Sequence, residues 1–389
     1  MRRMLAIIGL FALVTSVIVC GDSGEPSGTR SFLVVVESSL REPLRASLDQ
    51  YVETMELAHY EVHVEPWAPK STEERDKLLE LRTLLFDYVD SHGIEGALLV
   101  GDLPALMYEM PLKGTMEEFP TDIFLQDRDA VWPDTDNNGY SDAHSELEVD
   151  IYTSRLLGTE AELVDYFARA ERYRREGPLV DRSAYIFIDD DWSRRDTSDT
   201  YHLNQLYSEV DIVQAKEDSS LVNYIAKLTG DGAEFVYQWV HGAPPGTYSG
   251  WLAFDHLEEQ DRLPADLIDI DDLNLKVSFV NMANCYGARF TDEQLSVAEA
   301  YTFRTDYGLA VIGSTKTGAL ADPRRFHESL APGKRWGEAY NAWFTEEGMQ
   351  NESWHLGIVL MGDPLLQVTG DRFPSGTSAD MTLNSDESL

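Results

Sequence analysis

The stretch FVNMANCYGARF, residues 279–290, is an apolar run that ends in Cys285 and continues into a small turn residue. The stretch VYQWVHGAPPG, residues 236–246, is a second apolar run, and it ends in His241 and Gly242. Short continuous apolar runs of this kind are typical of strands buried in a parallel sheet. Because loops converge at the carboxyl edge of an open sheet, the thiol and the imidazole can meet there if the two strands are parallel neighbours.

This pair of side chains suits nucleophilic catalysis. The thiolate of a cysteine is the nucleophile, and a nearby imidazole can accept the thiol proton. Cys285 and His241 are therefore candidates for a catalytic pair. The alternatives are a buried structural thiol at Cys285 and a core or turn histidine at His241. The only other cysteine is Cys20, at the end of a secretory signal, so no disulfide is expected within the mature chain.

The amino terminus predicts export. Residues 1–20 combine a basic start with a short apolar run and read as a signal peptide. Cys20 is either the lipid-carrying first residue of a bacterial lipoprotein or a cysteine removed with the signal. Residues 21–30 are a polar tether, and residues 371–389 are poor in large apolar side chains and predict a disordered tail.

The charge of the chain limits its partners. With 69 acidic and 31 basic residues the formal net charge is −38. This charge argues against nucleic acid and anionic lipid as partners, because phosphate binding needs a basic face. Contact with a membrane is expected only through a signal or lipid anchor at Cys20. The acidic residues form either a heavily solvated surface or a surface that attracts cationic substrates.

The hydrophobic pattern predicts an α/β fold. Strand-like and helix-like segments alternate in two series, residues 31–176 and residues 177–370, which indicates mostly parallel sheets flanked by helices in two αβ subdomains. Residues 102–147 interrupt the first series and predict a long irregular insertion.

Several segments together resemble the gingipain family of cysteine peptidases, which has a caspase-like fold. The segments are ALLVGDLPALMYEMP (97–111), VDIYTSRLLG (149–158), SDTYHLN (198–204), VHG (240–242), NCYGARF (284–290), VAEAYTF (297–303), LAVIGST (309–315) and LMGDPLL (360–366). They follow the order of that family and span roughly residues 31–370. The resemblance implies a cysteine endopeptidase that acts on peptides or proteins.

The resemblance also implies roles for individual residues. Cys285 is the nucleophile, His241 assists it, and the backbone N–H groups of Gly242 and Cys285 hold the oxyanion. One of three adjacent acids, 189–191, orients the imidazole, and Asp190 is preferred. Asp199 forms the floor of a pocket for a basic side chain, and Leu320 stands where relatives that cleave after arginine have an aromatic wall. The alternatives are that the three acids are solvated loop residues and that Asp199 only caps the start of a helix.

The insertion contains a candidate calcium site. Oxygen-bearing side chains alternate along residues 134–142 with a glycine at the sixth position, which suits a turn that wraps a hard cation. The expected ligands are Asp134, Asp136, Asn138, the carbonyl of Tyr140, Asp142 and Glu146. The alternative is an acidic turn without metal. Because this loop lies in the insertion, Ca²⁺ is expected to be structural.

The sequence thus predicts an exported cysteine endopeptidase that cleaves after basic residues. Two alternatives use the same fold: a catalytically idle binding lipoprotein, and a cysteine transpeptidase in which an amine replaces water.

Overall fold

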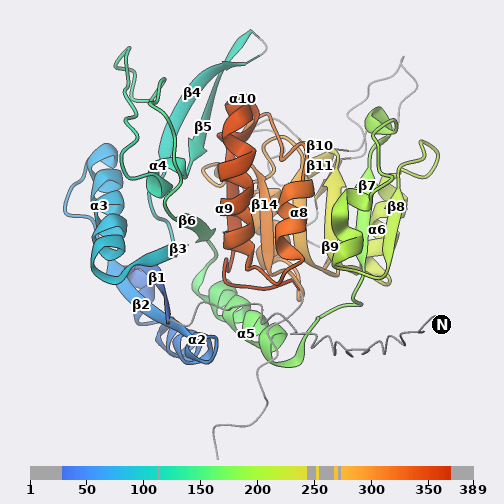
Figure 1. The fold of residues 1–389 in the computed structure, drawn as a ribbon, viewed down its shortest axis with the longest axis horizontal. Helices are drawn as coiled ribbons and strands as arrows, with labels where there is room; N and C mark the ends of the chain where they lie inside the picture. The colour runs from blue at the N-terminus through green and yellow to red at the C-terminus, as the bar shows by residue number, and fades with distance from the viewer. Residues whose placement is uncertain (1–28, 113, 243–250, 254–266, 270–272, 369–389) are drawn as a thin grey trace, which may run out of the picture.

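The computed structural model describes residues 29–112, 114–242, 251–253, 267–269 and 273–368 (Figure 1). The expected signal peptide, the anchor residue Cys20, most of the tether and the expected tail lie outside the described residues. Within the described part of the chain, no helix is both long enough and apolar enough to cross a membrane.

One ten-stranded sheet crosses the whole molecule (Figure 1). Its strands, in spatial order, are β2 (Tyr60–Trp67), β1 (Arg30–Glu37), β3 (Ile94–Val100), β6 (Tyr152–Leu156), β15 (Ile358–Gly362), β14 (Ala310–Ser314), β13 (Val277–Ala283), β9 (Ala233–Trp239), β7 (Ala184–Ile188) and β8 (Val210–Val213). Every pairing is parallel except that of β14 with β15. The predicted mostly parallel α/β fold is confirmed, and the two αβ series join edge to edge through β15.

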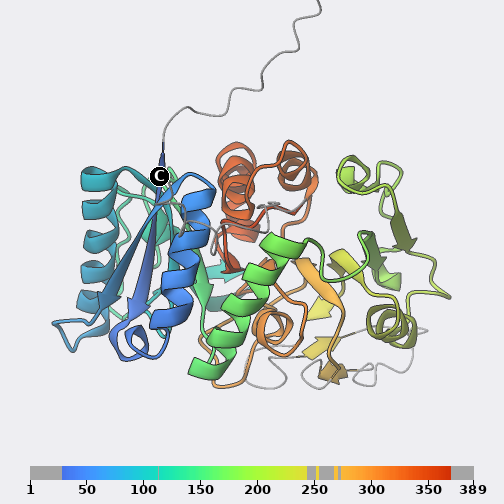
Figure 2. The same ribbon diagram turned by 90° about the horizontal axis from the view of Figure 1, so that it is seen from below.

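Helices cover both faces of this sheet (Figure 2). The α-helices are α1 (Ser38–Arg41), α2 (Arg45–Leu57), α3 (Glu74–His92), α4 (Ile123–Gln126), α5 (Glu160–Glu176), α6 (Leu221–Thr229), α7 (Val297–Phe303), α8 (Arg324–Leu330), α9 (Trp336–Glu346) and α10 (Glu352–His355). The 3₁₀ turns are η1 (Asp190–Trp192), η2 (Thr200–Gln205) and η3 (Gly348–Asn351). Helices α6 and α7 share a core cluster with one face of β9 and β13, whereas α8 and α9 pack on the other face.

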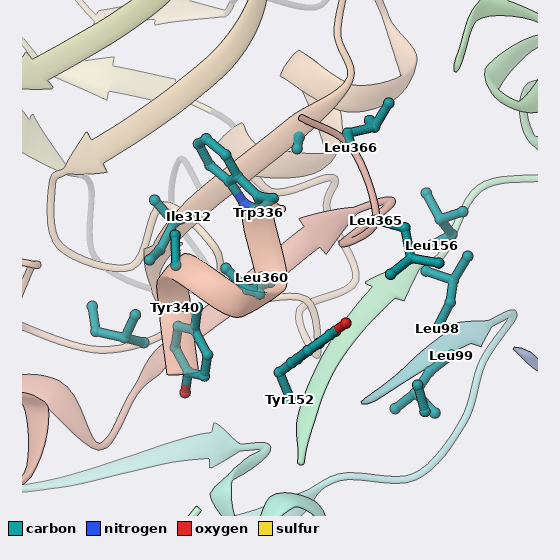
Figure 3. Packing of buried hydrophobic residues seen from close by; sticks show 14 of the residues in the cluster. Leu98, Leu99, Tyr152, Leu156, Ile312, Trp336, Tyr340, Leu360, Leu365 and Leu366 are labelled. Atoms are coloured by element: carbon teal, nitrogen blue, oxygen red, sulfur yellow. The ribbon is translucent and has the colours of Figure 1, made fainter. Parts of the chain in front are cut away.

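Tight packing closes the junction between the two halves (Figure 3). The ring of Tyr152 on β6 lies between Gly96 of β3 and Gly337 of α9. A Cβ atom at either glycine would come within 2.3 Å of this ring. Only glycine lets the strand and the helix approach the ring so closely, because no side chain intervenes.

A buried ion pair at the same junction joins helix α5 to the residue that follows β15. Asp363 follows this strand in the GDP segment and binds Arg174 of α5, and both side chains are only 1% exposed. The hydroxyl of Tyr51 donates to Asp363 at 2.9 Å, and the backbone N–H of Asp363 donates to the Tyr166 hydroxyl. A buried charge needs such a complete set of partners. This part of the family resemblance is therefore explained by the sheet junction rather than by catalysis.

Two smaller sheets lie outside the main one. The segment expected to be irregular contains an antiparallel hairpin, β4 (Leu106–Leu112) with β5 (Thr115–Thr121). Near the carboxyl edge of the main sheet, β10 (His241–Gly242), β11 (Trp251–Ala253) and β12 (Leu267–Asp269) form a three-stranded antiparallel sheet.

Candidate active site

The strands that lead to His241 and Cys285 are parallel neighbours, which is the condition under which the two side chains can meet. Trp239 at the end of β9 pairs with Ala283 at the end of β13. The N–H of Val240 donates to the carbonyl of Ala283 at 3.3 Å, which continues the pairing towards His241. Both strands end at the same edge of the sheet, so the half-buried residues Cys285 and His241 lie at the same end of the molecule.

Gly242 allows the segment after β9 to approach the segment after β13 closely. A Cβ atom at this position would lie 1.7 Å from the carbonyl oxygen of Cys285 and 3.0 Å from its backbone nitrogen. Only a residue without a side chain fits this contact. The two backbones expected to supply the oxyanion hole are therefore in direct contact.

Asp191 is the acid that contacts His241. Its Oδ2 accepts a hydrogen bond from His241 Nε2 at 3.0 Å. A carboxylate can only accept, so Nε2 carries a proton and Nδ1 of the neutral ring is left as the basic nitrogen. The ring of Trp192 lies 4.4 Å from the imidazole, centroid to centroid, and limits its rotation. Trp192 and Asp191 thus hold one orientation of the imidazole.

The preference for Asp190 is corrected by this geometry. The Asp190 carboxylate is almost buried and pairs with Lys216 at 3.2 Å. Asp189 caps the turn η1 by accepting the N–H of Asp190. The 3₁₀ turn therefore points three consecutive carboxylates at three different partners, and only that of Asp191 contacts the imidazole.

The loop after the cysteine is held by residues that the sequence did not single out. Tyr286 adopts a left-handed backbone conformation, with φ of 60°, and its N–H donates to the carbonyl of Lys316. Its hydroxyl donates to Glu117 of β5 at 2.5 Å and lies 2.7 Å from the hydroxyl of Thr317. Burial, followed by the bond to Glu117, raises the pKa of Tyr286 to about 12, so the phenol stays a donor at neutral pH. The insertion thus supports the residue next to Cys285.

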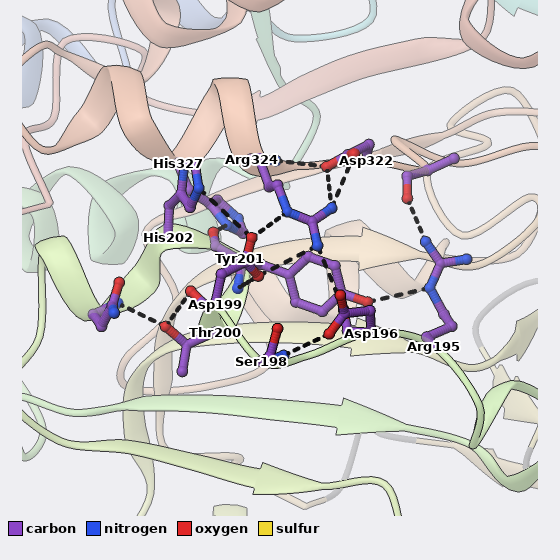
Figure 4. Close-up of polar contacts among 12 residues, drawn as sticks. Arg195, Asp196, Ser198, Asp199, Thr200, Tyr201, His202, Asp322, Arg324 and His327 are labelled. Atoms are coloured by element: carbon purple, nitrogen blue, oxygen red, sulfur yellow. Dashed lines mark hydrogen bonds and ion pairs between the residues drawn. The ribbon is translucent and has the colours of Figure 1, made fainter.

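Asp199 is already bound by an arginine (Figure 4). Its Oδ2 accepts from Nε of Arg324 at 2.5 Å, and its Oδ1 accepts from the N–H of Tyr201. Arg324 also donates to both carboxylate oxygens of Asp322 at 2.9 Å. Asp199 therefore caps the turn η2 and belongs to a network of charges within the chain.

The family segment SDTYHLN forms the 3₁₀ turn η2. Thr200, Tyr201 and His202 have φ angles of 53°, 48° and 64°. Three successive left-handed residues with side chains are unfavourable and need support from their surroundings. The buried His327 supplies it, because its Nδ1 donates to the Tyr201 carbonyl at 2.9 Å while its Nε2 accepts from the amide of Asn281. Burial lowers the pKa of His327 to about 3, so the ring is neutral.

Leu320 does not form an exposed wall. It is 1% exposed and belongs to the main hydrophobic core. The expectation that it lines the substrate pocket is therefore not met in this structure. The aromatic surroundings of His241 come instead from the half-buried Trp192, which contacts the buried Trp239. The guanidinium of Arg195 lies 3.6 Å from the centroid of the Trp239 ring.

The predicted calcium loop is only partly assembled as expected. Carboxylate oxygens of Asp136, Asp142 and Glu109 all lie within 4.8 Å of one another. Glu109 comes from β4, is 5% exposed, and was missed because it lies far from the loop in sequence. This donor set of hard oxygens fits Ca²⁺.

The other expected ligands differ in their surroundings. Asp134 accepts the N–H groups of Asn138 and Gly139, and Asn138 donates its amide to Glu109 at 2.9 Å. Both residues shape the turn. Glu146 is exposed and is not among the three clustered carboxylates, whereas Glu109 is. The expected closing ligand Glu146 is therefore not brought to the cluster.

Comparison with known proteins shows the family of the chain. The sequence model for peptidase family C25 matches residues 74–369, a range that includes β9, β13 and the loop of residues 134–142. No protein in the curated set matches the chain.

Proposed function

This chain belongs to peptidase family C25, the gingipain family of cysteine peptidases, and we propose that it cleaves internal peptide bonds with Cys285 as the nucleophile. The observation that carries the proposal is the junction of two strand ends. His241 follows β9, Cys285 follows β13, and these strands are parallel neighbours with Gly242 packed on the backbone of Cys285.

The geometry supports a sequence of proton transfers. His241 Nδ1 accepts the thiol proton, and Sγ of Cys285 attacks the carbonyl carbon of the scissile bond. The backbone N–H groups of Gly242 and Cys285 stabilise the oxyanion. The leaving amine takes the proton from His241 as the C–N bond breaks. Water then hydrolyses the acyl-enzyme, and His241 acts as the base for that step. Asp191 keeps Nε2 protonated throughout.

Substitution of the two central residues tests this proposal. Cys285→Ala should abolish cleavage of a mixed peptide library, and His241→Ala should lower the rate about 100-fold or more, the usual contribution of a general base. Intact-mass measurement with electrophilic peptides should detect one adduct, on Cys285. Full activity of Cys285→Ala with an unchanged melting temperature would refute the proposal.

Two alternatives give different results in the same experiment. An idle binding protein would form no adduct and would turn over no peptide. A transpeptidase would form the adduct on Cys285 but transfer the acyl group to an added amine in preference to water. Product analysis with and without a peptide amine acceptor separates hydrolysis from transfer.

A preference for a basic residue before the scissile bond stays a prediction. Asp199, the carboxylate on which it depends, is bound by Arg324. A substrate cation would therefore compete with a side chain of the same chain.

We also propose that the chain is exported and carries structural calcium. Export rests on the signal-like residues 1–20, with a lipid on Cys20 as one form and a secreted chain as the other. Mass determination of the mature amino terminus distinguishes these two forms, and an intact Met1 in the mature protein would refute export. The calcium site rests on the clustered carboxylates of Glu109, Asp136 and Asp142.

A further inference from the structure

The ion pair of Asp199 with Arg324 lies at the same end of the sheet as the catalytic pair. The guanidinium of Arg324 covers the ring of Tyr201 at 4.8 Å from its centroid. The hydroxyl of Tyr201 accepts from Arg195 at 3.2 Å, and Arg195 stacks on Trp239, two residues before His241. A continuous chain of contacts therefore connects the ion pair to the imidazole.

The loop before α8 connects the same region to the cysteine. Thr317 contacts Tyr286, the neighbour of Cys285, and the carbonyl of Ala321 accepts from Arg195 at 2.8 Å. Arg324 begins the helix that follows this loop. The ion pair is thus connected through two segments to the loops that carry His241 and Cys285.

The guanidinium of Arg324 has a complete set of acceptors (Figure 4). Its Nε and Nη2 donate to Asp199, its Nη1 donates to Asp322, and Nη2 also reaches the carbonyl of Asp196 at 3.4 Å. The side chains of Arg324 and Asp199 are 28% and 37% exposed, so the pair is partly shielded from water. The bond to Arg324 is also the main reason why the pKa of Asp199 is lowered.

A cationic substrate would have to displace this arginine. Asp199 has two oxygens, and both accept hydrogen bonds from groups of the chain. If an arginine or lysine side chain took the place of Arg324, the chain would lose a charge-assisted pair to form a similar one. The exchange leaves little net gain, because the new bond replaces one of the same kind.

We propose that Arg324 determines substrate specificity: it neutralises Asp199 from within the chain, so that an uncharged substrate side chain is favoured over a basic one. The inference rests on the proposed peptidase function and concerns the same site. It opposes the expectation that Asp199 is a free countercharge for a basic substrate residue.

The test compares two electrophilic peptides that differ only in charge. One carries arginine before the reactive group and the other carries citrulline, its neutral isostere. The rate of covalent labelling of Cys285 is measured for the wild type and for Arg324→Gln. The wild type should label with citrulline at least as fast as with arginine. Arg324→Gln should favour arginine by about ten-fold or more, the value of one hydrogen bond to a charged group.

Three further variants make the test specific. Arg325→Gln removes the neighbouring charge, which pairs with Glu346 and Glu328, and should not change the preference. Arg324→Lys keeps a cation beside Asp199 and should keep the preference for citrulline. The double variant Asp199→Asn/Arg324→Gln should lose the gain towards arginine, because the exposed carboxylate is then absent.

The inference is overturned by several results. These are a wild type that favours arginine ten-fold, an unchanged preference in Arg324→Gln at an unchanged melting temperature, and an equal gain in Arg325→Gln. Labelling of Cys285 by neither peptide in any variant would refute the proposed function itself and the inference with it.

Discussion

Gly242 packs against the peptide group of Cys285 so closely that a Cβ atom would lie 1.7 Å from the Cys285 carbonyl oxygen. Gly242, the residue after His241, and Cys285, the proposed nucleophile, therefore lie in direct backbone contact. A parallel strand pairing brings them together, and the absence of a side chain allows the final approach.

Gly242→Ala should consequently disrupt the site without removing either catalytic side chain. We expect cleavage to fall about 100-fold or more, as for the loss of an oxyanion donor. Gly93→Ala serves as the control, since it introduces an alanine at a left-handed position of the α3 cap with nothing within 4 Å. Peptide cleavage near the wild-type rate in Gly242→Ala would show that this contact does not matter for catalysis.

Asp191→Asn should lower kcat/KM by about two- to five-fold. The effect is modest because the pair with His241 is solvent-exposed, with side chains 39% and 52% accessible, and exposed pairs contribute only about 0.2–1 kcal/mol. Asp190→Asn is the matched control and should leave kcat/KM unchanged, because Asp190 pairs with Lys216. A larger loss in Asp190→Asn than in Asp191→Asn would restore the assignment made from sequence.

The strand ends of this site could be predicted from sequence because the signal is local. Apolar runs mark β9 and β13, and each passes directly into a chemically distinctive residue. The choice among Asp189, Asp190 and Asp191 could not be made in the same way. It depends on the 3₁₀ turn η1, whose rotation gives each carboxylate a different partner.

Contacts between distant segments could not be predicted from the sequence either. Glu117 supports Tyr286, and Glu109 completes the carboxylate cluster, but both lie on a hairpin with two prolines and several acids. Strands of this composition give no clear alternation. Arg324 lies 125 positions from Asp199, in a seven-residue helix that the hydrophobic pattern did not indicate. Charge pairs across such separations have no local sequence signal.

Ca²⁺ should raise the melting temperature in a concentration-dependent way, because only the folded loop presents the ligands. Glu109→Gln should lower the apparent affinity for Ca²⁺ in these melts at least ten-fold. Glu146→Gln should leave that affinity unchanged, because of these two residues only Glu109 belongs to the carboxylate cluster. Thermal melts in millimolar Ca²⁺ and after chelation provide the measurement.

The hairpin connects the proposed calcium site to the loop of Cys285, so chelation should also reduce peptidase activity. Glu109 on β4 pairs with Glu118 on β5, next to Glu117, which binds Tyr286. The absence of any change in melting on addition of Ca²⁺ or chelator would refute the metal site.

Glu234→Gln should flatten the pH dependence of stability. Glu234 is buried on β9, and its Oε1 accepts from the hydroxyl of Tyr173 at 2.8 Å. Burial raises its pKa from 4.5 to about 7. The folded state therefore binds a proton more tightly than the unfolded state, and this contribution to stability is fully present below pH 4.5 and is lost as the pH rises towards 7. Each pKa unit corresponds to about 1.4 kcal/mol, so the loss is of the order of 3 kcal/mol.

Urea unfolding at pH 5 and pH 8 measures how much the protonation of Glu234 contributes to the free energy of unfolding. The wild type should lose more stability between these two values than Glu234→Gln does, because the glutamine stays neutral and can still accept from Tyr173. Glu56→Gln, on the exposed side of α2, is the control and should follow the wild type. An identical pH dependence in wild type and Glu234→Gln would mean that Glu234 ionises in the folded protein as readily as in the unfolded chain, in which case its burial costs no free energy at neutral pH.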